Sequence, residues 1–417
     1  MKIVVYPHTM EVGGSQLNAI ELAGAVRDRG HEVVVLSEAG PLVDIVDRLG
    51  LERIPVDPRA GRRPSPTIVR QLRELTRARR LDALHGYEWP PGVEAFLAAS
   101  GRVAPVCTVM SMAVAPFLPP TMPLLVGTEH IRAAAAAVGH RSVTLLEPPV
   151  DVVANSPSFP AGDFRTRYGL DPEVPLVVVV CRLVAELKLE GLLAACDAVG
   201  ALVAAATPVQ LAIVGDGSAR DQVAEAAAKA NAAAGRTAVV LTGQLADPRS
   251  AYAAADVMLG MGGSALRALA FAKPLVVQGE RGFWSLLSTQ TQSIFLRQGW
   301  YGVGSEVDGR AAGAVRLAGI LRPLLADPGT RAQLGRLGRD LVVDRFSLQA
   351  AAELQERVYA AAVDGVAWPG RSTADAARTV AGVLRHKLSR KWQRWRGIVA
   401  TDDFNTVAGR GDAGGRR

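Results

Sequence analysis

Two basic side chains accompany one of the most apolar runs of the chain. The run LVVVVCRL at 176–183 is typical of a buried strand, and Arg182 and Lys188 lie at and just past its carboxyl end. Ligands of open parallel α/β sheets bind beyond that end of the strands. A guanidinium with bidentate geometry and an ammonium point charge at this edge would neutralise a leaving diphosphate. The alternative is that both are solvated loop residues.

Two glycine pairs stand where a predicted strand gives way to a predicted helix. With the serines that follow them, they are Gly13-Gly14-Ser15 and Gly262-Gly263-Ser264. A glycine pair lets backbone N–H groups approach phosphate oxygens, and the dipole of the following helix favours an anion. Each serine is also a candidate N-cap, so the alternative is two tight capped turns.

Three further polar residues follow predicted strands. Asp216, in Val-Gly-Asp-Gly, is predicted to be a turn residue. Glu280 follows PLVVQG and either contacts a ligand or pairs with Arg281 in a turn. His85, in LHGYEW, either contacts a substrate or is a buried histidine with satisfied ring nitrogens.

Short apolar strands alternate with helical patterns along both halves of the chain. In the first half, KIVVY at 2–6, a helix from Ser15 to Gly30 and HEVVVL at 31–36 form one βαβ unit of a parallel sheet. In the second half, strands are expected at 176–183, 209–217, 238–243, 256–260 and 274–279, with helices at 189–206, 218–234 and 264–272. The pattern predicts two doubly wound α/β domains that face each other across a cleft, with an anionic ligand between them.

Composition excludes several classes of protein. The chain has 417 residues and 49% hydrophobic residues, enough for two or three buried cores. No run of 18 apolar residues predicts a membrane span, and the first residues read as a strand rather than a secretory signal. Three widely spaced cysteines suit a reducing cytoplasm, and no histidine spacing or phosphate-loop motif predicts a metal site or a P-loop. Richness in Ala, Arg and Gly is typical of a GC-rich bacterial genome.

The net charge of +7 is concentrated in two stretches. Residues 375–417 hold ten Lys/Arg against four Asp, and residues 52–80 hold nine Arg against three acids. The remainder is slightly acidic, which argues against a nucleic-acid-binding surface.

In the tail, a helix over 375–396 would place one apolar stripe among basic residues, an interfacial membrane pattern. The alternatives are a helix docked on the body or a solvated tail. The stripe comprises Leu384, Leu388, Trp392 and Trp395. The segment 67–80 is a second basic amphipathic stretch.

Over residues 1–363 the chain resembles the retaining family 4 glycosyltransferases of GT-B fold. The motifs that carry the resemblance, in order, are GGSQLNAIELAGAVRDRGHEVVVL, LEPPVD, VCRLVAELKLEGLL, LAIVGDG, LTGQLADPRSAYAAADVML and ALRALAFAKPLVV. The resemblance implies that Arg182 and Lys188 hold the donor diphosphate and that Gly14 is the glycine of the phosphate loop. It also implies retention through same-face attack, with the leaving phosphate as the base.

The resemblance gives the domains their expected roles. They are an acceptor-side domain at 1–150, a Pro/Ser-rich linker at 151–172, a nucleotide-sugar-binding domain at 173–346, a helix at 347–363 that crosses back to the N-terminal domain, and a basic amphipathic or disordered tail at 364–417. No metal and no cofactor is expected, because the nucleotide-diphosphate sugar is itself the donor substrate.

Two departures from the family pattern make the chain an atypical member. The family usually carries two Glu eight positions apart, and here Leu259 and Arg267 occupy those positions. The strand that often ends in an active-site His ends in Met110. Arg267 and Glu280 are therefore the candidate donor contacts in that region.

The sequence thus predicts a glycosyltransferase that moves a sugar from a nucleotide-sugar to a lipid-linked or saccharide acceptor, in the cytoplasm and peripherally on the inner face of the cell membrane. The departures motivate an alternative, a non-catalytic GT-B protein acting as a membrane-associated partner or scaffold. A third reading is an epimerase or a phosphorylase. The latter normally needs a cofactor lysine, for which Lys273 is the candidate among only six lysines.

Overall fold

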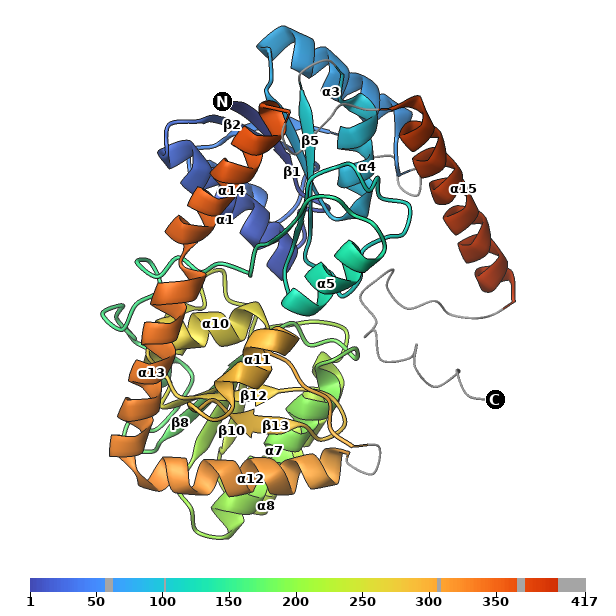
Figure 1. Cartoon of the computed structure of the whole chain (residues 1–417). Coiled ribbons are helices and arrows are strands. Elements are labelled where there is room, and N and C mark those ends of the chain that lie inside the picture. Colours follow the sequence, from blue (N-terminus) through green and yellow to red (C-terminus); the bar gives the residue numbers. More distant parts are fainter. Residues whose placement is uncertain (57–62, 101–102, 306–308, 366–371, 397–417) are drawn as a thin grey trace. The chain divides into compact units, whose positions relative to one another are not determined.

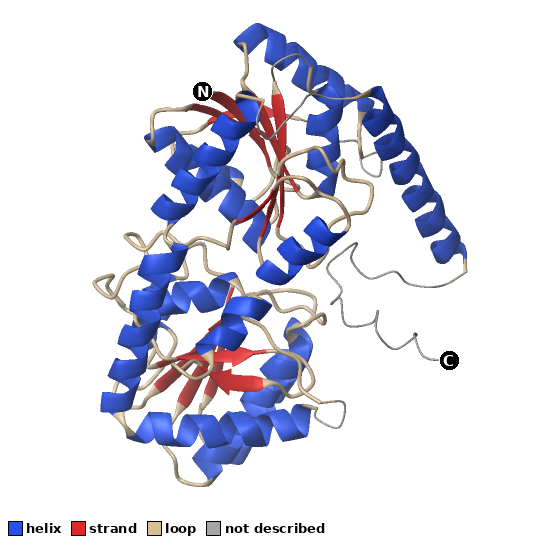
Figure 2. Ribbon diagram, viewed as in Figure 1, coloured by secondary structure: helices blue, strands red, loops and turns tan. Residues whose placement is uncertain are grey.

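A computed structural model describes residues 1–56, 63–100, 103–305, 309–365 and 372–396. The chain divides into two compact units, shown in Figure 1 and, by secondary structure, in Figure 2. Unit 1 comprises Met1–Pro148 and Leu348–Arg417, and unit 2 comprises Pro149–Ser347. Each unit is a β-sheet with helices on both faces, which confirms the expected pair of doubly wound α/β domains of GT-B type.

Unit 1 contains a seven-stranded sheet of order β3-β2-β1-β4-β5-β6-β7, in which every pairing is parallel. The strands are β1 (Lys2–Tyr6), β2 (Glu32–Ser37), β3 (Glu52–Pro55), β4 (Ala83–Tyr87), β5 (Ala104–Val109), β6 (Leu124–Val126) and β7 (Val143–Leu145). The helices are α1 (Gly14–Asp28), α2 (Val43–Arg48), α3 (Pro66–Arg79), α4 (Trp89–Ala98), α5 (Glu129–Ala137), α14 (Leu348–Val363) and α15 (Thr373–Trp395).

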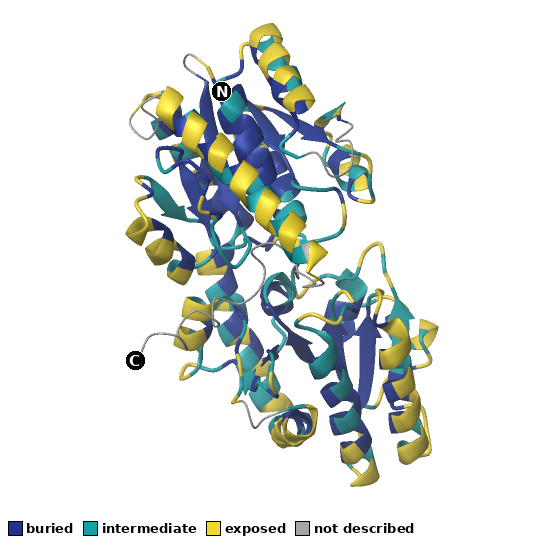
Figure 3. Ribbon diagram, turned by 90° about the vertical axis from the view of Figure 1, so that its right-hand side faces the viewer, coloured by how far each residue is buried: buried dark blue, intermediate teal, exposed yellow. Residues whose placement is uncertain are grey.

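The period of two along β1 explains why both faces of this sheet are covered. Ile3 and Val5 belong to a core cluster with residues of α1 and α14, whereas Val4 and Tyr6 belong to a cluster with residues of α3. A parallel strand buried on both faces reads as a continuous apolar run, which is how KIVVY reads. Figure 3 shows these strands as the most buried part of the unit.

Helix α14 returns the chain to unit 1 and packs on α1 and β5. Its Tyr359 is completely buried, and on its surface Glu356 pairs with Arg29 at 2.6 Å. The segment 347–363 is therefore helical, and from Leu348 onward it belongs to the N-terminal unit.

Unit 2 contains a six-stranded sheet of order β10-β9-β8-β11-β12-β13, parallel except for the antiparallel edge strand β13. The strands are β8 (Leu176–Val180), β9 (Gln210–Val214), β10 (Val239–Gly243), β11 (Val257–Gly260), β12 (Leu275–Gln278) and β13 (Trp284–Leu286). The helices are α6 (Phe164–Arg167), α7 (Leu189–Ala204), α8 (Arg220–Ala234), α9 (Arg249–Ala254), α10 (Gly263–Ala270), α11 (Gln292–Gln298), α12 (Arg310–Ala326) and α13 (Pro328–Phe346).

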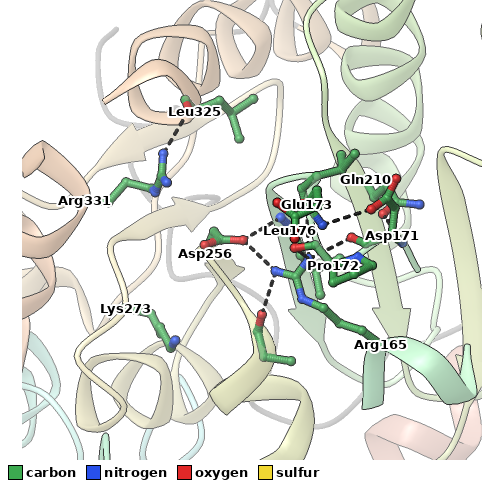
Figure 4. A network of polar contacts seen from close by, with 12 residues as sticks. Arg165, Asp171, Pro172, Glu173, Leu176, Gln210, Asp256, Lys273, Leu325 and Arg331 are labelled. Atoms are coloured by element: carbon green, nitrogen blue, oxygen red, sulfur yellow. Dashed lines mark hydrogen bonds and ion pairs between the residues drawn. The ribbon is translucent and has the colours of Figure 1, made fainter. Parts of the chain in front are cut away.

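The segment 151–172, expected as a linker, is instead an integral part of unit 2. Its Phe164 and Leu170 are buried in the core of the unit. Its Arg165 donates to Asp256 Oδ2 at 2.7 Å and to the carbonyl of Val174 at 2.8 Å, within the polar network of Figure 4. Asp256 also accepts from the backbone N–H of Leu176, so this network secures the segment to the start of β8. Richness in proline and serine concealed these buried anchors.

Each sheet has one point at which the strand order reverses. In unit 1 the chain builds β1, β2 and β3 in one direction and then continues from β4 on the other side of β1. In unit 2 it builds β8, β9 and β10 and then continues from β11 on the other side of β8. Loops that leave the two central strands at their carboxyl ends diverge at such a point, and ligands of open α/β sheets bind there.

Candidate active site

The loop that carries Arg182 is bonded to the loop after the neighbouring strand. Cys181 N–H donates to the carbonyl of Val214 at 3.0 Å, and Leu183 N–H donates to the carbonyl of Asp216 at 2.9 Å. Arg182 lies between these two bonded residues and is exposed. The backbone bonds on either side therefore hold an exposed guanidinium at the carboxyl edge of β8, beside the switch point of unit 2.

Two glycines make this close approach of the loops possible. A Cβ on Gly215 would lie 1.9 Å from the carbonyl oxygen of Cys181, and one on Gly217 would lie 2.3 Å from that of Leu183. Both have positive φ, +143° and +154°, which side chains rarely adopt. Between them, Asp216 is exposed and accepts from the N–H of Gly217 at 2.7 Å, and its place near a nucleotide stays a prediction.

Lys188 is the N-cap residue of α7 and is half-buried. Burial lowers the pKa of its ammonium to about 8; Cys181 opposes this shift and the charge of Arg182 reinforces it. Its carbonyl accepts from Gln278 Nε2 at 3.1 Å, and Gly191 leaves room for that amide, since a Cβ there would lie 2.3 Å from Nε2. The backbone of Lys188 is thus held at the start of α7 by Gln278 of β12.

The second glycine pair begins α10, as expected, but its serine does not cap the helix. Gly262 is the N-cap, at φ +55°. The hydroxyl of Ser264 donates to the carbonyl of Met261 at 3.0 Å, and the N–H of Ala265 bonds to the carbonyl of Gly262 at 3.1 Å. The expectation that Ser264 caps the helix is therefore wrong, because Gly262 is the N-cap and the Ser264 hydroxyl bonds back to Met261.

Arg267 places a further positive charge at this helix start. One of its guanidinium nitrogens lies 3.7 Å from the position that a Cβ on Gly263 would occupy. The side chain therefore runs back along the first turn of α10. Its charge also acts on the buried Tyr252: burial raises the pKa of that hydroxyl and Arg267 partly opposes the rise. Helix α10 thus begins beside a fixed cation after β11, the other strand of the switch point.

Glu280 follows β12 and is half-buried. Its carboxylate accepts a hydrogen bond from the hydroxyl of Tyr301, and its backbone N–H donates to the carbonyl of Gly302 at 3.0 Å. The pKa of Tyr301 is raised by burial and then by this carboxylate. Glu280 is thus bonded to the segment 301–302 through both its side chain and its backbone, and contact with a donor remains a prediction.

In unit 1, the first glycine pair also begins a helix without a side-chain cap. Gly13 is the N-cap of α1, and a Cβ there would lie 2.4 Å from Gln16 Oε1. Gly14 is exposed with no atom within 4 Å of a built Cβ. The hydroxyl of Ser15, expected as the cap, instead donates to Glu88 Oε1 at 2.9 Å.

Glu88 is the residue of this edge that the sequence did not single out. It follows β4 directly, with φ +66°, a strained conformation for a residue with a side chain. Its carboxylate accepts from the hydroxyl of Ser15, from the N–H of Met110 at 3.0 Å and from the hydroxyl of Ser111. Burial raises its pKa, against the opposing effect of these bonds. One carboxylate therefore joins the loops after β1, β4 and β5 at the switch point of unit 1.

We expect Glu88→Ala to lower the free energy of unfolding by about 2–4 kcal/mol, because it leaves three partly buried donors without their acceptor. Ser15→Ala is the matched control, since it removes one donor and keeps the carboxylate, and it should cost only about 1 kcal/mol. Equilibrium urea unfolding of both variants measures the difference. Equal losses would mean that Glu88 does not organise the three loops.

His85, predicted as a catalytic residue, is a structural residue in this fold. It is 1% exposed, its Nδ1 lies 2.6 Å from the Tyr359 hydroxyl and its Nε2 lies 2.7 Å from the Thr108 hydroxyl. Burial lowers its pKa to about 3, so the ring stays neutral. With both nitrogens bonded inside the core, His85 has no group left for a substrate, and the structural alternative replaces the catalytic one.

Lys273, the candidate for a cofactor lysine, is also a structural residue. Its Nζ donates to the carbonyl of Ala253 at 2.8 Å, and burial lowers its pKa. It precedes β12 and lies beside the network of Figure 4, at the amino ends of the strands. Among the described residues, no group of three His, Cys, Asp or Glu is arranged to hold a metal ion.

Comparison with known families gives consistent matches to both units. Residues 12–173 match the model of Glycosyltransferase Family 4, and residues 174–297 match the model of Glycosyl transferases group 1. Among curated proteins, no sequence matches this chain. The two family matches place the chain among the glycosyltransferases.

Solved structures agree on the fold. A glycosyltransferase from Rickettsia africae superposes with a TM-score of 0.68 at 15% identity, covering 86% of this chain and 97% of its own. HepE from Anabaena, in complex with UDP, superposes with a TM-score of 0.64 at 15% identity, covering 87% and 100%. WaaG, a glycosyltransferase involved in lipopolysaccharide biosynthesis, superposes with a TM-score of 0.58 at 15% identity, covering 86% and 99%.

Proposed function

We propose that this glycosyltransferase moves a sugar from a nucleotide-diphosphate sugar to a lipid-linked or saccharide acceptor, with retention of anomeric configuration. The observation that carries the proposal is the pair of cations at the switch point of unit 2. Arg182 is exposed in a loop held by backbone bonds on both sides, and Lys188 is fixed at the start of α7. A donor diphosphate is the anion that suits an exposed guanidinium on a fixed backbone and a half-buried ammonium.

The chemistry asked of these residues is electrostatic. As the bond between the anomeric carbon and the diphosphate oxygen breaks, negative charge grows on that oxygen, and Arg182 and Lys188 stabilise it. For retention, the acceptor hydroxyl attacks the same face of the sugar. It gives its proton to the departing phosphate, so that no side chain need act as a nucleophile. The anomeric configuration of the product, read by NMR coupling constants, tests this part.

Two observations bear on the donor. HepE from Anabaena has been solved in complex with UDP-glucose, which makes a uridine diphosphate sugar the first donor to test here. In this chain Arg267 lies along the first turn of α10, where the resemblance leads one to expect a carboxylate toward the ribose. We propose that Arg267 adds positive charge to the donor site, beside Gly262, Gly263 and Ser264. We also propose that Asp216 and Glu280 lie toward the nucleotide, while a phosphate contact of Gly13 and Gly14 stays a prediction from the sequence.

The test is calorimetric binding of UDP-, GDP-, ADP- and dTDP-sugars to the wild type and to Arg182→Ala. We expect one donor to bind, and the variant to bind it about 10–100-fold more weakly, because a charge-assisted bond contributes about 1.5–3 kcal/mol. Arg236→Ala is the matched control, since Arg236 is an exposed arginine before β10, at the amino ends of the strands. Its affinity should equal that of the wild type.

If no donor binds to the folded wild type, the proposal fails and the non-catalytic alternative takes its place. The chain would then be a GT-B protein that acts as a membrane-associated partner or scaffold. We also propose that it works on the inner face of the cell membrane, where nucleotide-sugars are available. The free thiols of Cys107, Cys181 and Cys196 support a reducing compartment.

A further inference from the structure

Helix α15 docks on unit 1 through a face that is largely polar or small. Asp375, Thr379 and Val383 are buried on this face, at 8%, 2% and 6% exposure. The hydroxyl of Thr121 donates to Asp375 Oδ2 at 3.2 Å. Gly382 sits against Phe117, since a Cβ there would lie 2.4 Å from the Cβ of that side chain.

Aromatic contacts continue the same docked face toward the middle of the helix. The ring of His386 lies 5.4 Å from that of Phe117 and 5.8 Å, edge to face, from that of Trp89. These contacts fix the rotation of α15 about its own axis. The side of the helix that faces away from unit 1 is therefore determined.

The apolar stripe predicted from the sequence lies on that outward side. Leu384 is 56% exposed, Leu388 68%, Trp392 49% and Trp395 82%. Figure 3 shows the outer side of α15 as exposed along the helix. A shallow groove on this side is lined by Ala381, Leu384, Arg385, Leu388, Ser389 and Trp392. The alternative of a helix docked on the body is therefore confirmed for α15 itself, but other residues make the contact and the stripe stays exposed.

Helix α3 shows what the opposite arrangement looks like in the same unit. It too is basic and amphipathic, but its apolar residues Ile68, Val69 and Leu72 are buried in the core. Its exposed positions include Arg70 and Arg77. The segment 67–80 is therefore not expected to act as a second membrane-binding helix, because its apolar residues pack into the core of the unit and cannot contact lipid.

Basic residues flank the exposed stripe of α15. Residues 373–396 hold seven Lys/Arg and one Asp, and that Asp375 is on the docked face. Arg385 and Lys391 are exposed, and the guanidinium of Arg396 lies 3.8 Å from the ring centre of Trp392. Long basic side chains beside tryptophan and leucine are suited to the boundary between lipid headgroups and acyl chains. None of the described helices is long and apolar enough to cross a bilayer.

We propose that the outward face of α15, formed by Leu384, Leu388, Trp392 and Trp395 with the flanking Arg385 and Lys391, is a docking surface for an anionic lipid membrane. The leucines and tryptophans enter the interfacial region, and the basic residues contact lipid phosphates. A second copy of the chain is a poor occupant, since two such helices would bring like charges together. This proposal rests on the proposed function in one respect only: membrane binding would bring the enzyme close to a lipid-linked acceptor.

The test is co-flotation of the full chain with vesicles of phosphatidylcholine containing 30% phosphatidylglycerol, and with pure phosphatidylcholine vesicles. We expect binding to the anionic vesicles, a blue shift of tryptophan emission, and at least tenfold weaker binding to the neutral ones. The variant Leu384→Gln/Leu388→Gln/Trp392→Gln should lose at least tenfold in binding. It should keep the thermal midpoint of the wild type, because all three side chains are exposed.

Charge is tested separately with matched pairs. Arg385→Gln/Lys391→Gln on α15 should weaken binding to the anionic vesicles severalfold, whereas Arg70→Gln/Arg77→Gln on α3 removes the same charge and should have little effect. No flotation of the folded wild type overturns the proposal. Equal flotation of the triple variant and the wild type also overturns it. The same holds if the triple variant disrupts a dimer or a complex with an acidic protein, because the face would then bind protein. Donor calorimetry of the triple variant should be unchanged, so this proposal and the proposed function can fail independently.

Discussion

Replacing Lys188 by Met is expected to lower kcat/KM for the nucleotide-sugar about 10²–10³-fold. The reason is that one group aimed at charge growing on a leaving phosphate contributes on that scale inside a partly buried site. Gln278 donates to the backbone carbonyl of Lys188 and Gly191 leaves room for that amide, so the start of α7 that carries this lysine is held in place. Steady-state kinetics with the donor identified by calorimetry measures the loss.

Lys229→Met is the matched control for charge and length. Lys229 lies exposed on α8 and pairs with Glu225 at 2.6 Å, so its removal should leave kcat/KM unchanged. Equal activity of Lys188→Met and the wild type would exclude the ammonium from the donor site.

The same lysine should give the reaction a pH dependence. Burial lowers its pKa to about 8, so the protonated form that binds the diphosphate is lost as the pH rises above that value in the free enzyme. We expect kcat/KM to fall about tenfold per pH unit above pH 8, and Lys188→Arg, which stays charged, to remove the fall. The thiol of Cys181, whose pKa burial raises to about 11, does not titrate in this range.

The free energy of unfolding should rise with pH over the same range in which kcat/KM falls. Between about pH 8 and the ordinary pKa of 10.5, the unfolded chain binds more protons at this lysine than the folded chain. The contribution of Lys188 to stability therefore improves as the pH rises through that window. Urea unfolding at pH 8 and pH 10 should show this rise in the wild type and not in Lys188→Met.

Gly215→Ala is expected to lower the free energy of unfolding of unit 2 by about 3 kcal/mol or more. The new Cβ would meet the carbonyl oxygen of Cys181 at 1.9 Å, at a backbone φ of +143°. Backbone strain and overpacking each cost about 1–3 kcal/mol, and the atom in the way is main chain and cannot rotate aside. The substitution should also weaken donor binding, because relief of the clash moves the loop that carries Arg182.

Gly235→Ala separates strain from collision. Gly235 has φ +63° with no atom within 4 Å of a built Cβ, so the variant should cost only about 1–2 kcal/mol. Urea unfolding and donor calorimetry on both variants make the comparison. If Gly215→Ala is no less stable than Gly235→Ala, the loops after β8 and β9 are not locked together as described.

The central strands could be predicted from the sequence, but of the four edge strands only β10, expected at 238–243 and observed at Val239–Gly243, was predicted. KIVVY and LVVVVCRL contain β1 and β8, which lie in the middle of their sheets and are buried on both faces. The edge strands β3, β7 and β13 are shorter and pair on one side only, so no apolar run distinguishes them. The sequence also predicted the glycine-rich helix starts, and at one of them Gly262 has φ +55°, a conformation that favours glycine.

The site was predictable only where residues follow a strand in an obvious pattern. Arg182 and Lys188 follow such a strand, and the structure places them at the switch point. Glu88 also follows a strand directly, in LHGYEW, but its role depends on donors from Ser15 and Ser111, which lie 73 and 23 positions away. His85 was predicted to contact a substrate because the sequence does not reveal its structural partner, Tyr359, which is 274 positions away.

By itself, the sequence determined the fold class, the order of the strands along the chain and the positions of the glycine turns, since each depends on local periodicity and backbone freedom. It also determined that the tail carries an apolar stripe among basic residues. Only the tertiary structure decided which face of α15 docks. Both faces of that helix can satisfy a helical pattern, and the contacts of Thr121, Phe117 and Trp89 choose the one that leaves Leu388 and Trp395 outside.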